Sequence, residues 1–340
     1  MHTLFRGLKI AGVVLGFLIL AGAILAADLY RFSHLPAEAE GQGEPVTLRI
    51  EKGQGFSVTA GELEKRGLVR SATRLRILAR LTGTDTDIKA GQYRLSPSMP
   101  PIEILEHLVK GMELLYRVTI PEGSTMAQIA AIIEKEQFCP ASSFLSAATD
   151  QALLAEYGVD AATAEGYLFP ETYHFPRPAD CRNVVRAMMA RFADVFTPEY
   201  EERAGVLGLS VHEVVTLASI IEKETGDPTE RATISSVFHN RLDKRMRLQS
   251  DPTVIYGLKD FDGNLIRHDL RTPTPYNTYT IRGLPPGPIA NPGEAAIRAA
   301  LYPEDTDYLF FVSKRNGSHH FSRNLREHNM AVRKYQLRRR

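Results

Sequence analysis

Glu222 and Glu224 are two carboxylic acids at the end of an apolar segment, and their spacing gives them different surroundings. Apolar residues recur every three or four positions over 214–225, and Gly226-Asp-Pro follows, which predicts a helix that stops there. At about 100° per residue, Glu224 falls on the apolar face, whereas Glu222 falls toward the polar edge. Burial raises the pKa of a carboxylic acid, and an acid that keeps its proton at neutral pH can serve as a general acid.

The other face of this helix is expected to meet solvent, because His212, Ser219 and Lys223 project there. Glu224 also has an alternative environment, since helix ends fray and a glutamate in the last turn can reach water. The helical projection alone therefore leaves Glu224 either as a buried acid or as a solvated one.

Composition narrows the class of protein. The chain has 340 residues, of which 44% are hydrophobic and 24% charged, enough for a sizeable core and about two domains. The net charge of +1 gives no electrostatic case for a nucleic-acid partner. Neither a Cys-x-x-Cys nor a His-Glu-x-x-His spacing occurs, so no metal or other cofactor is implied.

Several motifs surround the acidic pair in a fixed order, from roughly residue 115 to the end of the chain. They are Gly166-Tyr-Leu-Phe-Pro-Glu-Thr-Tyr173, Ala218-Ser-Ile-Ile-Glu-Lys-Glu-Thr225, Asn240-Arg-Leu242, Leu248-Gln-Ser-Asp-Pro-Thr-Val-Ile-Tyr256, Tyr276-Asn-Thr-Tyr279 and Gly283-Leu-Pro-Pro-Gly-Pro-Ile-Ala290. Together they resemble the YceG-like family of endolytic murein transglycosylases. The resemblance implies that Glu224 is the catalytic acid, and Glu224-Thr225 is also similar to the Glu-Ser pair of lysozyme-like lytic transglycosylases.

The resemblance implies cleavage of nascent peptidoglycan strands at the bond between N-acetylmuramic acid and N-acetylglucosamine. Glu224 would protonate the glycosidic oxygen, and its carboxylate would then accept the proton of the muramic C6 hydroxyl. That hydroxyl closes on C1 and leaves a 1,6-anhydro end, with neither a second carboxylate nor a cofactor. The family also implies a role in cell-wall assembly and strand-length control, beside peptidoglycan synthases of elongation or division.

Two other functions stay open at this point. A lysozyme-like hydrolase would use a partner carboxylate about 5–5.5 Å away for retention or about 6.5–9.5 Å away for inversion, and Asp251, Glu171 and Asp269 are candidates. A non-enzymatic scaffold would hold the cell-wall synthesis machinery to glycan and would need only an anchor and a binding module. Reducing ends would mark the hydrolase, and full cellular function of a Glu224→Gln variant would mark the scaffold.

Polar and aromatic side chains of the motif loops are candidate glycan contacts. Residues 248–253 have turn chemistry, and the Pro-rich loops 272–279 and 284–288 can shape a cleft or simply cross the surface. The candidate substrate-binding residues are Glu171, Tyr173, Gln249, Ser250, Asp251, Asn277 and Tyr279. His319 and His320 follow an expected strand over 308–312, and such a pair is expected to be structural or solvated.

The N-terminal segment has the features of a membrane anchor. Ile10 to Ala27 is an uncharged apolar run preceded by Arg6 and Lys9, which predicts one transmembrane helix with a cytoplasmic N-terminus. A cleaved signal peptide is the alternative, because small residues recur over 21–27. With either an anchor or a signal peptide, the rest of the chain is expected to be exported. A transmembrane anchor would hold it on the periplasmic or extracytoplasmic side of the inner membrane.

The fold class expected after the anchor is α+β. A strand at 46–51, helices opening at Ser57 and Ser71, and a strand at 91–95 resemble a LysM-like module, a small fold that binds N-acetylated glycans or serves as a spacer. Further helices are expected over 125–137, 142–155, 183–196 and 229–242, in a helix-rich catalytic domain with short sheets. The expected division is residues 1–31 as cytoplasmic N-terminus and transmembrane helix, 32–45 as linker, 46–114 as LysM-like domain and 115–340 as catalytic domain.

Cys139 and Cys181 are the only cysteines in the chain. An even pair in an exported, oxidising compartment favours a disulfide, with two buried free thiols as the alternative. Neither arrangement bears on catalysis.

Overall fold

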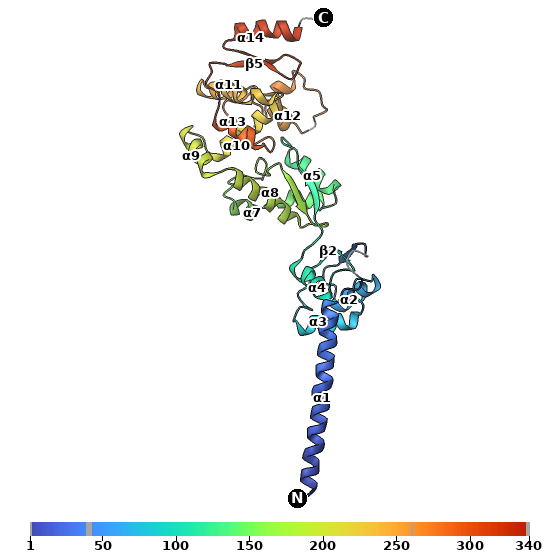
Figure 1. The fold of residues 1–340 in the computed structure, drawn as a ribbon. Coiled ribbons are helices and arrows are strands. Elements are labelled where there is room, and N and C mark those ends of the chain that lie inside the picture. The colour runs from blue at the N-terminus through green and yellow to red at the C-terminus, as the bar shows by residue number, and fades with distance from the viewer. Residues whose placement is uncertain (1, 39–42, 260, 338–340) are drawn as a thin grey trace. The chain divides into compact units, whose positions relative to one another are not determined.

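The computed structural model describes residues 2–38, 43–259 and 261–337, so residues 39–42 of the expected linker lie outside the described part. The chain divides into two compact units. Unit 1 comprises residues 1–116 with 176–178, and unit 2 comprises 117–175 with 179–340. Helices and three two-stranded sheets account for the regular structure of the described residues, which confirms the mixed α+β class (Figure 1).

The first helix, α1 (His2–His34), is longer than the apolar run predicts. Its segment Gly12–His34 is long and apolar enough to cross a membrane, and side chains such as Phe17 are exposed along it. Its last turns instead pack into unit 1, where Phe32 is only 5% exposed. The helix therefore continues three residues into the expected linker, because Phe32 is part of a hydrophobic core.

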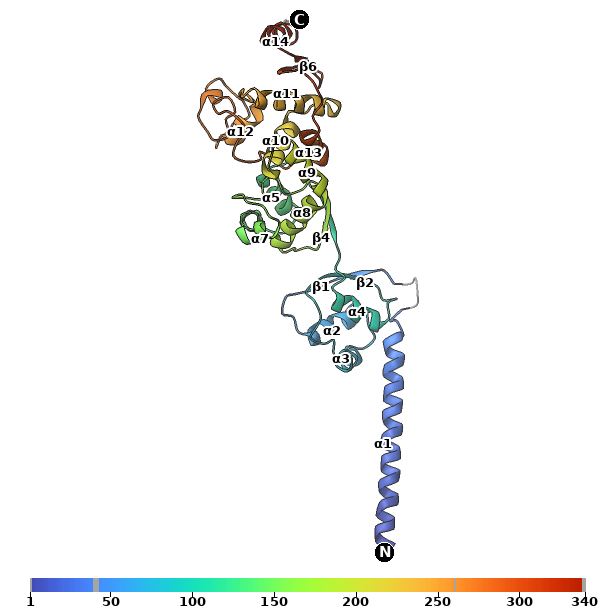
Figure 2. The ribbon, with the colours of Figure 1, turned by 90° about the vertical axis from the view of Figure 1, so that its left-hand side faces the viewer.

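Unit 1 has the expected strand-helix-helix-strand order, followed by one more helix. Its elements are β1 (Val46–Ile50), α2 (Phe56–Lys65), α3 (Ala72–Leu81), β2 (Gly91–Leu95) and α4 (Pro101–Lys110). The strands pair antiparallel, with Val46 opposite Leu95 (Figure 2). Ser71 caps α3 as predicted, whereas α2 starts at Phe56 after an N-cap at Gly55, because the Phe56 side chain is buried in the core.

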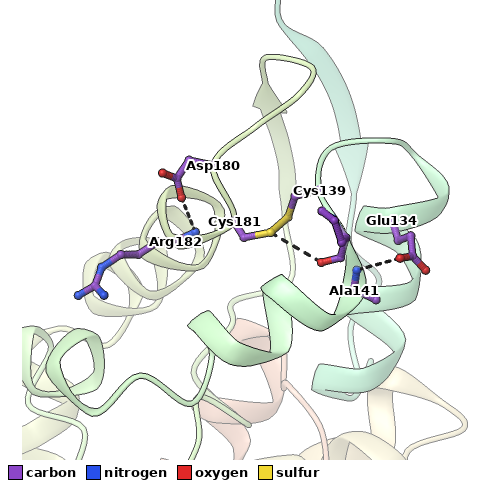
Figure 3. The surroundings of a disulfide bond; sticks show 7 residues. Glu134, Cys139, Ala141, Asp180, Cys181 and Arg182 are labelled. Carbon is purple, nitrogen blue, oxygen red and sulfur yellow. Dashed lines mark hydrogen bonds between the residues drawn. A yellow bond between two sulfur atoms is a disulfide. The ribbon is translucent and has the colours of Figure 1, made fainter. Parts of the chain in front are cut away.

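The first half of unit 2 consists of a short sheet and five helices. These elements are β3 (Tyr116–Thr119), α5 (Met126–Lys135), α6 (Ala141–Ala147), α7 (Gln151–Glu156), β4 (Thr172–Phe175), α8 (Cys181–Val195) and α9 (Pro198–Val206). The single helix expected over 142–155 is in fact two, because the Asp150 carboxylate accepts from the backbone of α7 and caps it. A disulfide joins Cys139, after α5, to Cys181 at the start of α8 (Figure 3).

The second half of unit 2 carries the acidic pair. Its elements are α10 (Val211–Glu224), η1 (Pro228–Glu230), α11 (Arg231–Asp243), α12 (Asp251–Gly257), η2 (Asp269–Arg271), α13 (Glu294–Leu301), β5 (Phe310–Ser313), β6 (His319–Ser322), α14 (Leu325–Val332) and η3 (Arg333–Leu337). Helix α10 begins with a capping box between Ser210 and Glu213 and packs against α13 (Figure 1).

Helix α10 is buried on more sides than its sequence pattern predicts. Ser219, expected to face solvent, is fully buried. Its hydroxyl donates to the carbonyl of Thr216 at 2.7 Å and accepts from the backbone N–H of Ile289 at 3.0 Å. The prediction was wrong because the loop of residues 283–290 crosses this face. The small Ser219 hydroxyl accepts a hydrogen bond from the backbone of that loop.

Candidate active site

A cavity of about 300 Å³ opens at the C-terminal end of α10. Its wall takes residues from α10, α11, α12, the β5–β6 hairpin and α14, all within unit 2. The polar side chains that line it include Glu224, Arg241, Gln249, Asp251, Tyr279 and His319. The predicted acid therefore lies in the wall of a largely polar hollow.

The surroundings of Glu224 raise the pKa of its carboxyl group. It is half-buried, and its Oε1 accepts a hydrogen bond from the Ser250 hydroxyl at 2.6 Å. Burial raises the pKa of Glu224 to about 7, against the lowering effect of the Ser250 hydrogen bond, while the charge of Asp251 raises it further. A substantial fraction of Glu224 is consequently protonated near neutral pH, as a general acid requires.

Glu222 has a different environment, and it is not the one the helical projection predicts. Its side chain is 9% exposed, within 3.4 Å of the Arg231 guanidinium, and it accepts from the backbone N–H of Gly293 at 3.1 Å. The expected polar edge is covered because Arg231 and the loop before α13 close over it. Glu222 is not part of the cavity wall and acts as a structural ion-pair partner.

The end of α10 is fixed by a close backbone approach. Thr225 caps the helix in an extended conformation, and its hydroxyl donates to the carbonyl of Ile221 at 2.6 Å. A side chain on Gly226 would place its Cβ 2.6 Å from the carbonyl oxygen of Gly317, in the turn between β5 and β6. Only glycine lets this hairpin approach the end of the acid helix so closely.

Two motif loops come together beside Glu224. Gln249 has a left-handed φ of 52°, and the next residue, Ser250, donates its backbone N–H to the Thr278 hydroxyl at 2.9 Å. The helix α12 then starts at Asp251, so the expected turn ends sooner than predicted because Pro252 begins a helical turn. The Tyr279 hydroxyl donates to Asp251 Oδ1 at 2.7 Å. The structure thus places Gln249, Asp251 and Tyr279 in the cavity wall, with Ser250 bonded to the acid.

Three other candidate contacts lie outside the cavity wall. Asn277 is fully buried, and its amide donates to backbone carbonyls that include Thr272 at 2.7 Å, so it shapes its own loop. Glu171 accepts from Arg191 at 3.2 Å, and the Tyr173 hydroxyl donates to the carbonyl of Phe169 at 2.7 Å. These groups already have protein partners.

Of the three possible partner carboxylates of a hydrolase, only one lies in the wall of the cavity that contains Glu224. Asp251 shares the cavity with Glu224, whereas Asp269, in η2, accepts from the backbone N–H of Ile266 at 2.9 Å and lines a different hollow. Glu171 belongs to the segment beside β4 and is also outside the wall.

Arg241 and His319 are polar residues of the cavity wall that sequence reasoning did not select as site residues. Arg241 is 7% exposed, and its guanidinium donates to the carbonyls of Leu248 and Leu309, both at 2.7 Å, which ties the motif loop to β5. His319, expected to be structural or solvated, lies in the wall, while His320 packs near Tyr335. Neighbours on a strand point to opposite faces, and that alternation was the available signal that one histidine of the pair could face the cavity.

A half-buried carboxylic acid that is hydrogen-bonded to a hydroxyl in a polar cavity has the chemistry expected of a general acid for glycosidic bonds. The sequence model of the YceG-like family matches residues 48–334, and the chain belongs to this family. The predicted family is thus confirmed.

Similar proteins agree with this assignment. The endolytic murein transglycosylase of Bacillus subtilis (strain 168) is 34% identical over 334 residues, which cover 94% of this chain and 91% of that protein. The endolytic murein transglycosylase of Streptococcus pneumoniae serotype 2 (strain D39) is 28% identical over 94% of this chain, which spans 64% of the pneumococcal protein. A crystal structure of a yceG-like protein from Listeria monocytogenes has a TM-score of 0.59 and 34% identity, and the match covers 84% of this chain and 98% of that one.

Proposed function

We propose that this chain is a membrane-anchored lytic transglycosylase that cleaves peptidoglycan strands between N-acetylmuramic acid and N-acetylglucosamine. The observation that carries the proposal is Glu224, a cavity-wall acid whose pKa burial raises to about 7. Membership of the YceG-like family, and the endolytic murein transglycosylases among its relatives, support the same substrate. The cellular role is cell-wall assembly and the control of strand length.

In the proposed reaction one carboxyl group acts twice. Glu224 donates its proton to the glycosidic oxygen as the bond from that oxygen to muramic C1 breaks. The resulting carboxylate then accepts the proton of the muramic C6 hydroxyl, whose oxygen closes on C1. The acid is regenerated and no water is consumed. The hydroxyl of Ser250, 2.6 Å from Glu224 Oε1, stabilises the carboxylate between the two steps.

The other polar groups of the cavity are proposed as glycan contacts. Gln249, Asp251 and Tyr279 offer an amide, a carboxylate and a phenol to sugar hydroxyl and acetamido groups. Glu171 and Tyr173 remain proposed contacts for a more distant part of a strand. Asn277 acts indirectly, through the loop that carries Tyr279.

The proposed localisation is the inner membrane, with a single span and an extracytoplasmic C-terminal region. Arg6 and Lys9 favour a cytoplasmic N-terminus for α1. The disulfide between Cys139 and Cys181 supports an oxidising compartment for unit 2.

The two expected domains retain their proposed roles. Residues 46–114 form a LysM-like glycan-binding module, supported by the βααβ order of β1, α2, α3 and β2. Residues 115–340 form the catalytic domain. Peptidoglycan synthases of elongation or division are the proposed protein partners.

Product analysis tests the function. The full chain in detergent digests purified peptidoglycan, and mass spectrometry identifies the new ends. Wild type and Glu222→Gln are expected to produce anhydro-muramic ends, whereas Glu224→Gln loses about 100-fold or more of the initial rate, because a positioned acid contributes at least that much.

Each contrary outcome would support a different function or a different catalytic acid for this chain. Reducing ends in place of anhydro ends would indicate a hydrolase, with Asp251 as the partner carboxylate. Activity that survives Glu224→Gln but not Glu222→Gln would transfer the acid role to Glu222. No cleavage by wild type would favour the non-enzymatic scaffold.

A further inference from the structure

The cavity wall contains a histidine that the proposed chemistry does not use. His319, the first residue of β6, lines the same cavity as Glu224. Its side chain is 11% exposed, so it is not a solvated surface histidine.

Glu230 holds this histidine through both its backbone and its ring. The His319 backbone N–H donates to both carboxylate oxygens of Glu230, at 2.9 and 3.0 Å. The ring Nδ1 lies 2.8 Å from Glu230 Oε2. Because both oxygens of Glu230 already accept from the backbone N–H of His319, we assign Glu230 as the acceptor of the ring contact too and place the proton on Nδ1. Glu230 thereby sets both the orientation of the ring and the nitrogen that carries its proton.

The other ring nitrogen is left for an external partner. Among the residues that the structure describes, none hydrogen-bonds to His319 Nε2, and this atom is not one of the buried unpartnered polar atoms. Phe311, also in the cavity wall, packs edge-to-face against the ring with centroids 5.4 Å apart. A ring fixed by a carboxylate on one side and by an aromatic neighbour presents Nε2 with little freedom to move.

The backbone links this histidine to the acid. Glu230 ends η1, which is separated from Thr225, the C-terminal cap of α10, by Gly226 and Asp227 only. The hairpin turn before His319 touches the same segment, where Gly317 approaches Gly226. Glu224 and the His319–Glu230 pair are therefore positioned by one continuous stretch of chain and the hairpin packed on it.

We propose that His319 is a further substrate-contacting residue of this cavity. Its Nε2 hydrogen-bonds to a sugar hydroxyl of the glycan strand while Glu224 reacts, and Glu230 is the positioning residue. The inference rests on the proposed transglycosylase function and adds a glycan contact to it.

Two substitutions of His319 test the roles of its two ring nitrogens, Nδ1 and Nε2, separately. In His319→Asn the amide N–H overlays Nδ1, so the contact with Glu230 is retained and the group at Nε2 is lost. In His319→Gln the amide overlays Nε2, so a polar group still reaches the cavity and the ring contact with Glu230 is lost. The backbone hydrogen bonds to Glu230 persist in both variants.

The experiment measures kcat/KM for release of anhydro ends from purified glycan strands, and the thermal midpoint, for the full chain in detergent. His319→Asn is expected to keep the wild-type midpoint and to lose about tenfold in kcat/KM, the effect of one hydrogen bond. His319→Gln is expected to retain more activity with a lower midpoint. His320→Asn, on the neighbouring residue outside the wall, is the matched control and should leave kcat/KM unchanged.

Two outcomes overturn the inference while the proposed function stands. An unchanged kcat/KM in His319→Asn would show that the His319 ring contacts Glu230 but makes no glycan contact through Nε2. Equal losses in both variants, with lowered midpoints, would assign His319 a purely structural role. Absence of anhydro ends from wild type is the separate result that removes the proposed function itself.

Discussion

At the scale of single residues, the protonation of Glu224 depends on two opposing effects. Burial favours the neutral acid, and the hydrogen bond from Ser250 favours the carboxylate. Their balance leaves the pKa at about 7, which suits the proposed role of one group that donates and then accepts a proton. The hydroxyl of Ser250 is therefore expected to set the pH range of activity.

Replacing Ser250 by alanine tests this expectation. In the proposed reaction the acid form of Glu224 donates the first proton, so kcat/KM is expected to fall as pH rises through the pKa of Glu224. Loss of the Ser250 hydrogen bond raises that pKa, because the bond stabilises the charged form more than the neutral acid. The alkaline limb of the pH profile should move to higher pH by roughly one unit in Ser250→Ala. Ser143→Ala, in the remote helix α6, should leave the profile in place, and an unshifted limb in Ser250→Ala would disprove the role of the hydroxyl.

A second buried acid, Glu165, lies outside the cavity wall, so we expect it to affect stability and not the reaction. It accepts from the backbone N–H of Met126 at 2.9 Å, from Asn291 Nδ2 at 2.8 Å and from the Tyr256 hydroxyl at 3.3 Å. Burial nonetheless raises its pKa from 4.5 to about 7. The carboxyl group ties the start of α5 to α12 and to the Pro-rich loop.

The raised pKa of Glu165 makes stability depend on pH. Between pH 4.5 and about 7 the unfolded chain has released a proton that the folded chain still holds, so stability falls as pH rises through this window. The full effect is about 3 kcal/mol at most. Thermal midpoints across this range should fall less steeply in Glu165→Gln than in wild type, although the variant is less stable overall because an NH2 donor replaces one of the two acceptor oxygens. Glu224 contributes with the same sign, so Glu224→Gln is run alongside, and parallel curves for wild type and Glu165→Gln would contradict the assignment.

At the scale of secondary-structure elements, the active cavity depends on how the β5–β6 hairpin meets the end of α10. The elements are far apart in sequence, and Gly226, just after α10 ends, lies against Gly317 in the hairpin turn. The hairpin in turn carries Phe311 and His319 into the wall. A displacement of the hairpin should change the cavity while the rest of α10 stays packed.

A methyl group at Gly226 provides that displacement. Its Cβ would lie 2.6 Å from the Gly317 carbonyl oxygen, so the backbone must shift. Gly226→Ala is expected to lower kcat/KM more than tenfold. It should also lower the free energy of unfolding by about 1–3 kcal/mol, which is seen as a lower thermal midpoint. Gly205→Ala is the matched control, since its Cβ meets nothing within 4 Å in α9. That variant should be neutral or more stable by about 0.5–1 kcal/mol, and full activity of Gly226→Ala would show that the hairpin contact is dispensable.

At the scale of the whole molecule, α1 combines an apolar segment exposed along its length with a C-terminal end that belongs to a folded unit. Val13 to Leu25 include many exposed apolar side chains, whereas Leu29 and Phe32 pack against the core of unit 1. Asp28 also pairs with Arg74 at 3.2 Å. An anchor can therefore be removed without damage only if the cut precedes Asp28.

Two truncations test this organisation. Removal of residues 1–27 and removal of residues 1–34 should both release the chain from the membrane fraction, measured by sedimentation. The shorter truncation should retain the thermal stability of unit 1, whereas the longer one loses the buried Phe32 and about 3–5 kcal/mol with it. Membrane association of both truncated chains would show that α1 is not the anchor, and equal midpoints would show that Phe32 does not contribute to the core.

Much of the local structure could be predicted from the sequence. The period of α10, its end at Gly226 and the position of Glu224 on its apolar face follow from residues adjacent in the chain. The strands and helices of unit 1 follow from alternation, from the cap at Ser71 and from Pro and Gly boundaries. The order of the motifs also indicated the family, which the match over residues 48–334 confirms.

The tertiary structure alone decided which groups surround the acid. Ser219 is buried because the distant Ile289 backbone needs an acceptor, and His319 reaches the cavity because Glu230 holds it there. Phe32 belongs to a core rather than to a linker because residues later in the chain cover it. Helix and strand periods encode contacts within one element, whereas these environments come from segments far apart in sequence, whose packing no local pattern records.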